Sequence, residues 1–198
     1  MAATPYIIGG SEVTPHSIPW QVAIEGANGG RPDCGGTLIS NRHVLSAAHC
    51  GDRDVVIVGK HSLKDSSDGV RHKICKTVFH PNFNAKTMEY DFAIHHLELP
   101  VEFDSSVSPA CLPSGRSGNV RTGKKMRVSG WGWLEYQSYE LSSWPDKLQG
   151  VDVSAIANDK CRNLYHGIIP ITSDMICAQG VENGFQSNDA CLGDSGGL

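Results

Sequence analysis

Two features of this 198-residue chain predict an all-β fold. Short apolar runs recur along the sequence between turn residues, as in barrels and sandwiches. Long apolar stripes with the 3.6-residue helical period are absent, apart from one candidate helical turn at 158–164. With 39% hydrophobic and 19% charged residues, the composition suits a globular protein that buries a substantial core.

The expected strands fall into two groups along the chain. The first group is 20–25, 36–39, 55–59, 75–80 and 92–97, and the second is 126–130, 148–153 and 174–178. Turn-forming residues such as Gly, Pro and Ser lie between these runs. The segment 109–122 between the groups is rich in Pro, Gly and Ser, so we interpret it as a crossing between two halves.

Charge and hydropathy exclude several classes of function. The formal net charge is −4 and the sequence pI is about 6.1, so no basic surface for nucleic acid or anionic lipid is expected. No apolar run approaches the length of a membrane span. Residues 1–6 lack the basic start and apolar stretch of a secretory signal, and we interpret them as a pro-segment remnant or an artificial start.

A candidate nucleophile lies in the sequence Cys-Leu-Gly-Asp-Ser-Gly-Gly at 191–197. Glycines on both sides leave the main chain around Ser195 free to turn sharply, so that its hydroxyl can project and nearby N–H groups can point at an oxyanion. Taken alone, the same string is equally typical of an ordinary acidic turn, because Gly, Asp and Ser are common turn residues.

Two further segments favour the nucleophile. Leu-Ser-Ala-Ala-His-Cys at 45–50 supplies His49 as a base, and Tyr-Asp-Phe-Ala-Ile at 90–94 supplies Asp91 to orient it. With these motifs in the order His, Asp, Ser, the chain resembles the trypsin/chymotrypsin family of serine endopeptidases. The resemblance runs from Ile7 onward and includes Ile-Ile-Gly-Gly at 7–10, Pro-Trp-Gln-Val at 19–22, Cys-Gly-Gly-Thr-Leu-Ile at 34–39 and Ser-Gly-Trp-Gly at 129–132.

The resemblance implies two Greek-key, six-stranded β-barrels with the site in the cleft between them. The N-terminal barrel is expected over 7–110, the crossing over 111–122 and the C-terminal barrel over 123–198. The family continues for several strands and a terminal helix beyond the serine loop. The second barrel is therefore expected to be incomplete in this chain, with exposed sheet edges.

The resemblance also implies roles for the site residues. Ser195 resembles the nucleophile, His49 the base that takes its proton, and Asp91 the acceptor that fixes the tautomer of His49. The main-chain N–H groups of Gly193 and Ser195 are expected to form the oxyanion hole. Asp189 matches the base of a pocket for Arg or Lys side chains, and the alternative is that it belongs to a polar surface loop.

Two positions match the activation switch of the family. The α-amino group freed by cleavage before Ile7 is expected to pair with Asp194, so a chain that keeps residues 1–6 is expected to be inactive. The residue before this cleavage point is Tyr6, not Arg or Lys. Activation by a protease of different specificity is therefore expected, unless the start is artificial.

Seven cysteines indicate an oxidising compartment, so we expect a secreted, extracellular protein. The resemblance implies two disulfides, Cys34–Cys50 and Cys161–Cys177. The pairing of the other three cysteines, Cys75, Cys111 and Cys191, stays open.

Metal ions and cofactors are not expected. No close Cys-x-x-Cys or Cys-x-x-His pair favours zinc. The calcium loop of trypsins begins with a carboxylate ligand, whereas this chain has Lys60 at that point, so calcium is not expected either.

The function expected from the sequence is a serine endopeptidase that cleaves after Arg or Lys. Its expected partners are protein or peptide substrates and protease inhibitors. The alternative is a catalytically silent homologue, or an inactive fragment, that binds a partner through the same fold. All three motif positions are filled, which favours the enzyme.

Overall fold

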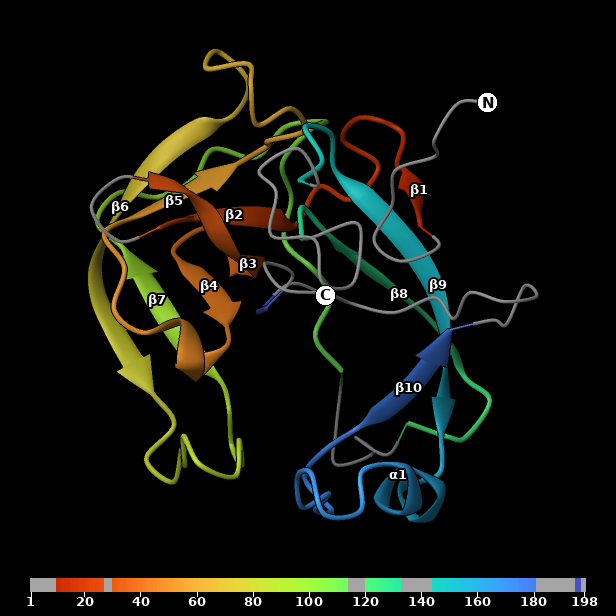
Figure 1. The fold of residues 1–198 in the computed structure, drawn as a ribbon. Helices are drawn as coiled ribbons and strands as arrows, with labels where there is room; N and C mark the ends of the chain where they lie inside the picture. Colours follow the sequence, from red (N-terminus) through yellow and green to blue (C-terminus); the bar gives the residue numbers. More distant parts are fainter. Residues whose placement is uncertain (1–9, 27–29, 114–119, 133–143, 181–194, 197–198) are drawn as a thin grey trace.

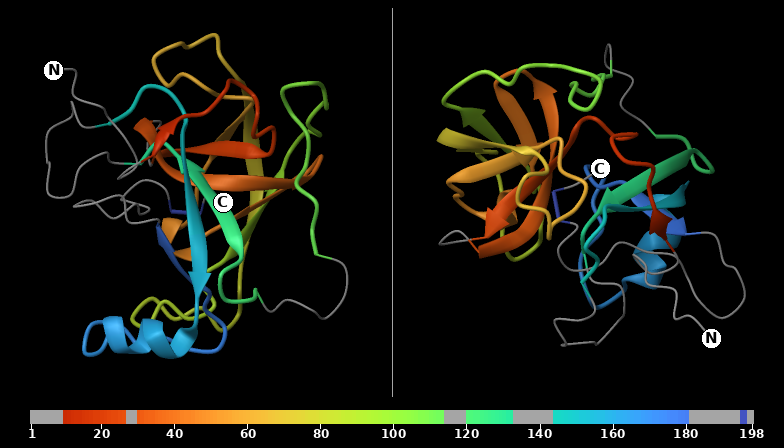
Figure 2. Two further views of the ribbon diagram at one scale, coloured as in Figure 1. Left: turned by 90° about the vertical axis from the view of Figure 1, so that its right-hand side faces the viewer. Right: turned by 90° about the horizontal axis from the view of Figure 1, so that it is seen from above.

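The computed structural model describes residues 10–26, 30–113, 120–132, 144–180 and 195–196. These residues form a closed β-barrel and a smaller second sheet, which lie side by side (Figures 1 and 2). The fold class predicted from the sequence is confirmed, with one closed barrel and a partial second sheet. The expected crossing at 111–122 includes residues 114–119, which lie outside the described ranges.

The barrel closes in the order β2-β3-β4-β7-β6-β5, and every neighbouring pair is antiparallel. Its strands are β2 (Gln21–Gly26), β3 (Gly30–Ser40), β4 (His43–Ser46), β5 (Val55–Val58), β6 (Val70–Phe79) and β7 (Ala93–Leu97). Apolar side chains from most of these strands fill the interior, as in other small barrels. The fully buried members include Val22, Ile24, Leu38, Val44 and Val56.

The second sheet has β9 (Gln149–Ile156) at its centre. On one side β9 pairs with β8 (Lys125–Gly130), and on the other with both β1 (Ser11–Glu12) and β10 (Cys177–Gly180). Helix α1 (Asn158–Leu164) follows β9 and confirms the expected helical turn. Asp159 lies in its first turn, where a carboxylate interacts favourably with the helix dipole.

The two sheets share a packed interface. Ala23 and Ile57 of the barrel form one buried cluster with Trp131 and Leu148 of the second half. The indole Nε1 of Trp131 donates to the carbonyl of His61 at 3.1 Å, so its polar atom is satisfied within the interface. The barrel therefore supports the second sheet along a fixed surface.

Several strands differ from the sequence-based expectation. The short strands β1 and β4 were not expected, and β3 begins six residues earlier than its apolar run. Strand β10 begins at Cys177, not at residue 174. Strand β10 begins late because a side chain holds the preceding residues as a turn. The Asn158 Nδ2 amide donates to the carbonyls of Thr172 and Met175 at 2.9 and 3.0 Å.

Candidate active site

His49 lies on a one-turn 3₁₀ helix (Ala48–Cys50) that follows β4. The neighbouring Cys50 forms a disulfide with Cys34 of β3, so this turn is covalently attached to the barrel. The side chain of His49 is 31% exposed, which leaves part of the ring accessible. The barrel therefore fixes the backbone of His49 while its ring faces outward.

Asp91 holds His49 through both of its carboxylate oxygens. Oδ1 accepts the main-chain N–H of His49 at 2.8 Å, and Oδ2 lies 2.6 Å from Nδ1 of the ring. An ionised carboxylate only accepts hydrogen bonds, so Nδ1 carries the proton in this pair. In a neutral ring Nε2 is then the nitrogen without a proton, and it is free to accept one.

The main chain of Ser195 lies against the same turn. Its carbonyl accepts the N–H of Gly35 on β3 at 2.7 Å. The same oxygen is 3.8 Å from Sγ of Cys50, the residue after His49. This sulfur is in a disulfide and has no hydrogen to donate, so the approach is a packing contact. The structure thus brings His49, Asp91 and the Ser195 backbone into one region from three separate segments.

Gly196 permits this close approach. Its φ of +79° is a left-handed conformation that side chains disfavour. A Cβ at this position would lie 2.3 Å from the Ser46 hydroxyl and 2.5 Å from the carbonyl oxygen of Gly35. The Ser46 hydroxyl itself donates to that carbonyl at 2.8 Å. Sequence reasoning noted the glycine but missed Gly35 and Ser46, because only the barrel register places them beside it.

The turn before Asp91 is built from unusual backbone conformations. Met88 and Tyr90 have positive φ values of 56° and 53°. Interaction with the Asp174 carboxylate, in the second half of the molecule, raises the pKa of the Tyr90 phenol. Sequence reasoning missed Tyr90, since the motif around Asp91 does not specify a phenol.

Several expected site residues lie outside the described ranges. They are Ile7, Asp189, Cys191, Gly193 and Asp194. The primary pocket, one donor of the oxyanion hole and the activation pair therefore stay predictions. Among the described cysteines, Cys75 and Cys111 are exposed and unbridged.

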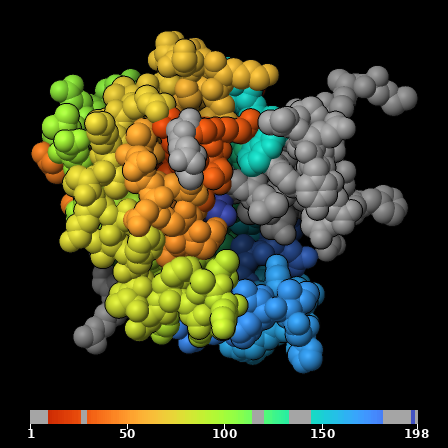
Figure 3. Space-filling model, turned by 60° about the vertical axis from the view of Figure 1, so that its left-hand side comes forward, coloured from red at the N-terminus to blue at the C-terminus, as the bar shows by residue number. Residues whose placement is uncertain are grey.

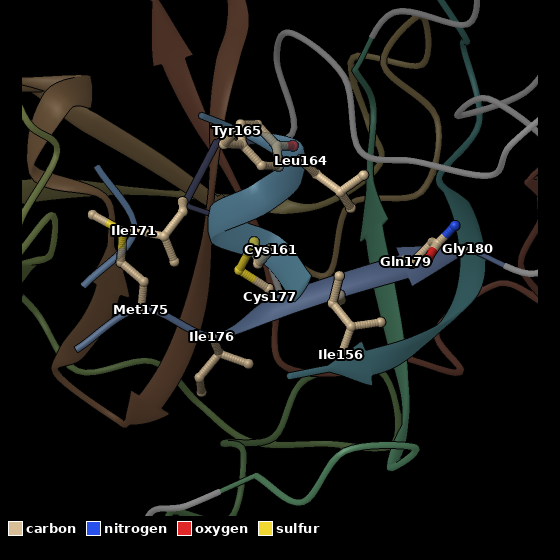
Figure 4. Close-up of a pocket in the computed structure, with 11 residues that line it drawn as sticks. Ile156, Cys161, Leu164, Tyr165, Ile171, Met175, Ile176, Cys177, Gln179 and Gly180 are labelled. Atoms are coloured by element: carbon tan, nitrogen blue, oxygen red, sulfur yellow. A yellow bond between two sulfur atoms is a disulfide. The ribbon is translucent and has the colours of Figure 1, made fainter. Parts of the chain in front are cut away.

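The second expected disulfide, Cys161–Cys177, is present and connects α1 to β10. Beside it lies a cavity of about 520 Å³ lined mainly by apolar side chains (Figure 4). Leu164 and Tyr165 from the end of α1 and Ile176 next to β10 contribute to its wall. His49, Asp91 and Ser195 do not line this cavity, so it is separate from the candidate active site.

The loop that follows Lys60 is organised by the lysine itself. Its ammonium donates to the carbonyls of Asp65 and Asp68 at 2.6 and 2.7 Å, and the residue is only 8% exposed. The Asp68 carboxylate accepts the N–H groups of His61 and Ser62. Within the described ranges, no group of three or more His, Cys, Asp or Glu side chains could hold a metal ion.

Over the same part of the chain, no helix is both long and apolar enough to cross a bilayer.

Comparison with known proteins gives consistent matches over nearly the whole chain. A family model described as Trypsin matches residues 7–197. The chain is 41% identical over 201 residues to human kallikrein-12, covering 99% of this chain and 75% of that protein. It is 36% identical over 194 residues to trypsin-3 of Salmo salar, covering 96% of this chain and 75% of that protein.

Two further matches extend this set. The clotting factor G beta subunit of Tachypleus tridentatus is 33% identical over 208 residues, which cover 96% of this chain and 64% of that protein. The solved structure of neuropsin, a serine protease expressed in the limbic system of mouse brain, matches with a TM-score of 0.81 at 33% identity. That match covers 96% of this chain and 80% of the neuropsin chain.

Proposed function

This chain belongs to the trypsin family of serine proteases, and we propose that it hydrolyses peptide bonds through His49, Asp91 and Ser195. The observation that carries the proposal is the double contact of Asp91 with His49, beside the main chain of Ser195. The three residues come from distant segments, and their convergence matches the needs of a nucleophile, its base and the group that orients the base.

The geometry supports a specific division of labour. Asp91 holds the proton on Nδ1 of His49, so that Nε2 accepts the proton of the Ser195 hydroxyl as its oxygen attacks the scissile carbonyl carbon. The same nitrogen then donates the proton to the leaving amine, and water releases the acyl group from Ser195 by the same two steps. The N–H groups of Gly193 and Ser195 stabilise the oxyanion.

Ser195→Ala tests this assignment. Without the hydroxyl no acyl-enzyme forms, and kcat falls by about 10⁶-fold, the order known for this change in a comparable triad. A serine-directed phosphonate probe should label the parent protein at Ser195 and leave the variant unlabelled. If Ser195→Ala keeps amidase activity within about tenfold of the parent, the assignment is contradicted. Such a loss is smaller than the contribution of general acid–base catalysis alone. A folded chain that never reacts with the probe would instead be a silent homologue.

We further propose that cleavage occurs after Arg or Lys, because Asp189 stands where the family places the base of its primary pocket. A buried carboxylate pairs with a cationic side chain and is left unpaired by an aromatic one. Asp189→Ser should therefore lower kcat/KM for arginyl substrates far more than for phenylalanyl substrates. A parent enzyme that already prefers aromatic substrates would rule out this pocket.

Activation is proposed to depend on Ile7 and Asp194. The amine released by cleavage before Ile7 would neutralise the Asp194 carboxylate and order the loop that holds Gly193. Protein beginning at Ile7 should hydrolyse an arginyl amide substrate, protein that keeps residues 1–6 should not, and Asp194→Asn should abolish the difference. Equal activity of the two forms would exclude the switch.

The protein is proposed to act outside the cell on protein or peptide substrates. The two disulfides support this location, since such bonds persist in oxidising compartments.

A further inference from the structure

Asp91 lies at the centre of a tight turn on the molecular surface. The main-chain N–H of Phe92 donates to the Tyr90 carbonyl at 2.8 Å, which closes a three-residue turn around Asp91. Figure 3 shows the segment around residues 80–92 (yellow-green) exposed on one face of the molecule. The side chains of Met88 and Phe92 are exposed as well. Side-chain burial is therefore a weak constraint on where the Asp91 carboxylate points.

The backbone of this turn is unfavourable for its own sequence. Met88 and Tyr90 adopt left-handed φ values of 56° and 53°, which side chains of this size disfavour. Such conformations persist where the surrounding structure determines them, and they cluster at functional sites. Contacts to the residues beside Asp91 must therefore hold the turn in place.

His80 contacts both neighbours of Asp91. Its ring stacks on that of Tyr90, with centroids 4.7 Å apart and planes 11° from parallel. The same ring lies against Phe92 at a centroid distance of 4.7 Å, with the planes tilted by 55°. In addition, the main-chain N–H of His80 donates to the Phe92 carbonyl at 3.1 Å. His80 therefore holds the turn on both sides of the carboxylate.

The position of His80 is itself fixed by the barrel. His80 directly follows β6, whose last residue, Phe79, pairs with Ala93 of β7. Nδ1 of the His80 ring accepts the main-chain N–H of Asn82 at 3.2 Å, and the His80 carbonyl accepts the N–H of Phe83 at 3.0 Å. Because these bonds fix both the backbone and the ring, the ring is a fixed support for the turn.

We propose that His80 is a positioning residue of the active site, whose ring directs the Asp91 carboxylate onto His49 by packing against the residues on both sides of it. The two carboxylate oxygens contact the main chain and the ring of His49 at 2.8 and 2.6 Å, so a small rotation of the turn would lengthen at least one contact. The inference rests on the proposed function of Asp91 and His49.

Three substitutions in the protein beginning at Ile7 separate the ring of His80 from its hydrogen bond. His80→Ala removes both and should lower kcat by about 10²-fold, as expected for a displacement near 1 Å. His80→Asn keeps an acceptor for the Asn82 N–H but no ring, and it should lose about as much. His80→Phe keeps the ring and should restore kcat to within about threefold of the parent, because aromatic packing does not need the imidazole nitrogens.

KM separates positioning from substrate binding. KM for a short arginyl amide should stay within about twofold of the parent in all three variants, because the loss of an interaction made in the transition state lowers kcat alone. A rise in KM with kcat unchanged would assign His80 to substrate binding and would overturn the proposal.

His43→Ala is the matched control. His43 is also half-buried, and its ring lies 4.6 Å from that of His96, toward the end of β7 that is remote from Asp91. This variant should leave kcat unchanged. An unchanged kcat in His80→Ala or His80→Asn, or a loss in His80→Phe or His43→Ala equal to that of His80→Ala, would overturn the proposal.

A spectroscopic readout separates this proposal from the proposed function. In full-length protein with His49 protonated, its Nδ1–H bound to Asp91 should give a strongly downfield proton resonance, which Asp91→Asn removes. His80→Ala should shift or broaden that resonance, and His80→Phe and His43→Ala should not. If the parent hydrolyses no substrate, the proposed function fails and this resonance still decides the role of His80: an unaltered signal in folded His80→Ala excludes it.

Discussion

Asp91 binds both the ring and the main chain of His49, one carboxylate oxygen to each. The main-chain bond at 2.8 Å sets the distance between the two segments, and the bond at 2.6 Å sets the rotation of the ring. Both bonds involve an ionised acceptor, which makes them stronger than bonds between neutral groups. The pair is therefore rigid before any substrate binds, which is what efficient proton transfer requires.

The first prediction concerns this pair. In Asp91→Asn, the remaining carbonyl oxygen can accept only from one of the two His49 donors, and the amide favours a proton on the other ring nitrogen. We expect kcat to fall by about 10⁴-fold, the size known for this substitution in a Ser-His-Asp protease. Active-site-titrated kinetics on an arginyl amide measure it. Asp152→Asn, at an exposed ion pair on β9, is the control and should leave kcat unchanged. If Asp91→Asn lowers kcat by less than about tenfold, the loss is too small for a change of the His49 tautomer, and the prediction is wrong.

The second prediction concerns the contact that seats the serine loop. Gly196→Ala places a Cβ within 2.5 Å of the Gly35 carbonyl, so the main chain at Ser195 must move. A shift of about 1 Å lowers kcat about 10²-fold. Gly123→Ala is a matched control, because Gly123 also has positive φ, at 83°, but nothing lies within 4 Å of the added atom. If both variants lose the same activity, backbone strain and not the clash would be responsible.

The third prediction concerns Lys60. Lys60→Met leaves the carbonyls of Asp65 and Asp68 without their ammonium donor, and we expect the free energy of unfolding to fall by about 1–3 kcal/mol. Urea unfolding measures the change, and Lys86→Met at an exposed site should have little effect. Added Ca²⁺ should not raise the melting temperature of the parent protein. A clear rise would show that oxygen ligands for calcium exist despite the lysine.

Local sequence patterns predicted most of the barrel because its strands are apolar and bounded by turn residues. Val55–Val58 became β5 with little change from its apolar run. The strand His43–Ser46 was missed, because four residues that begin with a histidine carry too little periodicity. Strand β1 is stabilised by pairing Ser11 with Gly150, a partner that no local pattern reveals.

In the candidate site, too, local patterns predicted some residues, while others depend on distant partners. His49, Asp91 and Ser195 were identified by motifs, because each motif combines a reactive side chain with its special backbone setting. The supporting contacts of Gly35 and Tyr90 depend on which segments the tertiary fold brings together. Position-specific support of this kind is set by packing between distant segments, so a single sequence does not specify it.

The last prediction follows from the raised pKa of Tyr90. Interaction with the Asp174 carboxylate favours the neutral phenol in the folded state. A phenol in the unfolded chain ionises near pH 10, so the unfolded state loses its proton first as the pH rises. The contribution of Tyr90 to stability should therefore be full below about pH 10 and should be lost as the pH rises through the higher pKa of the folded state. Urea midpoints of parent and Tyr90→Phe should differ near neutral pH and converge in this alkaline range. In the Asp174→Asn background the cause of the raised pKa is gone, so Tyr90→Phe should no longer change the pH dependence of the urea midpoint. If the two midpoints still converge at alkaline pH in that background, another group is responsible for the convergence.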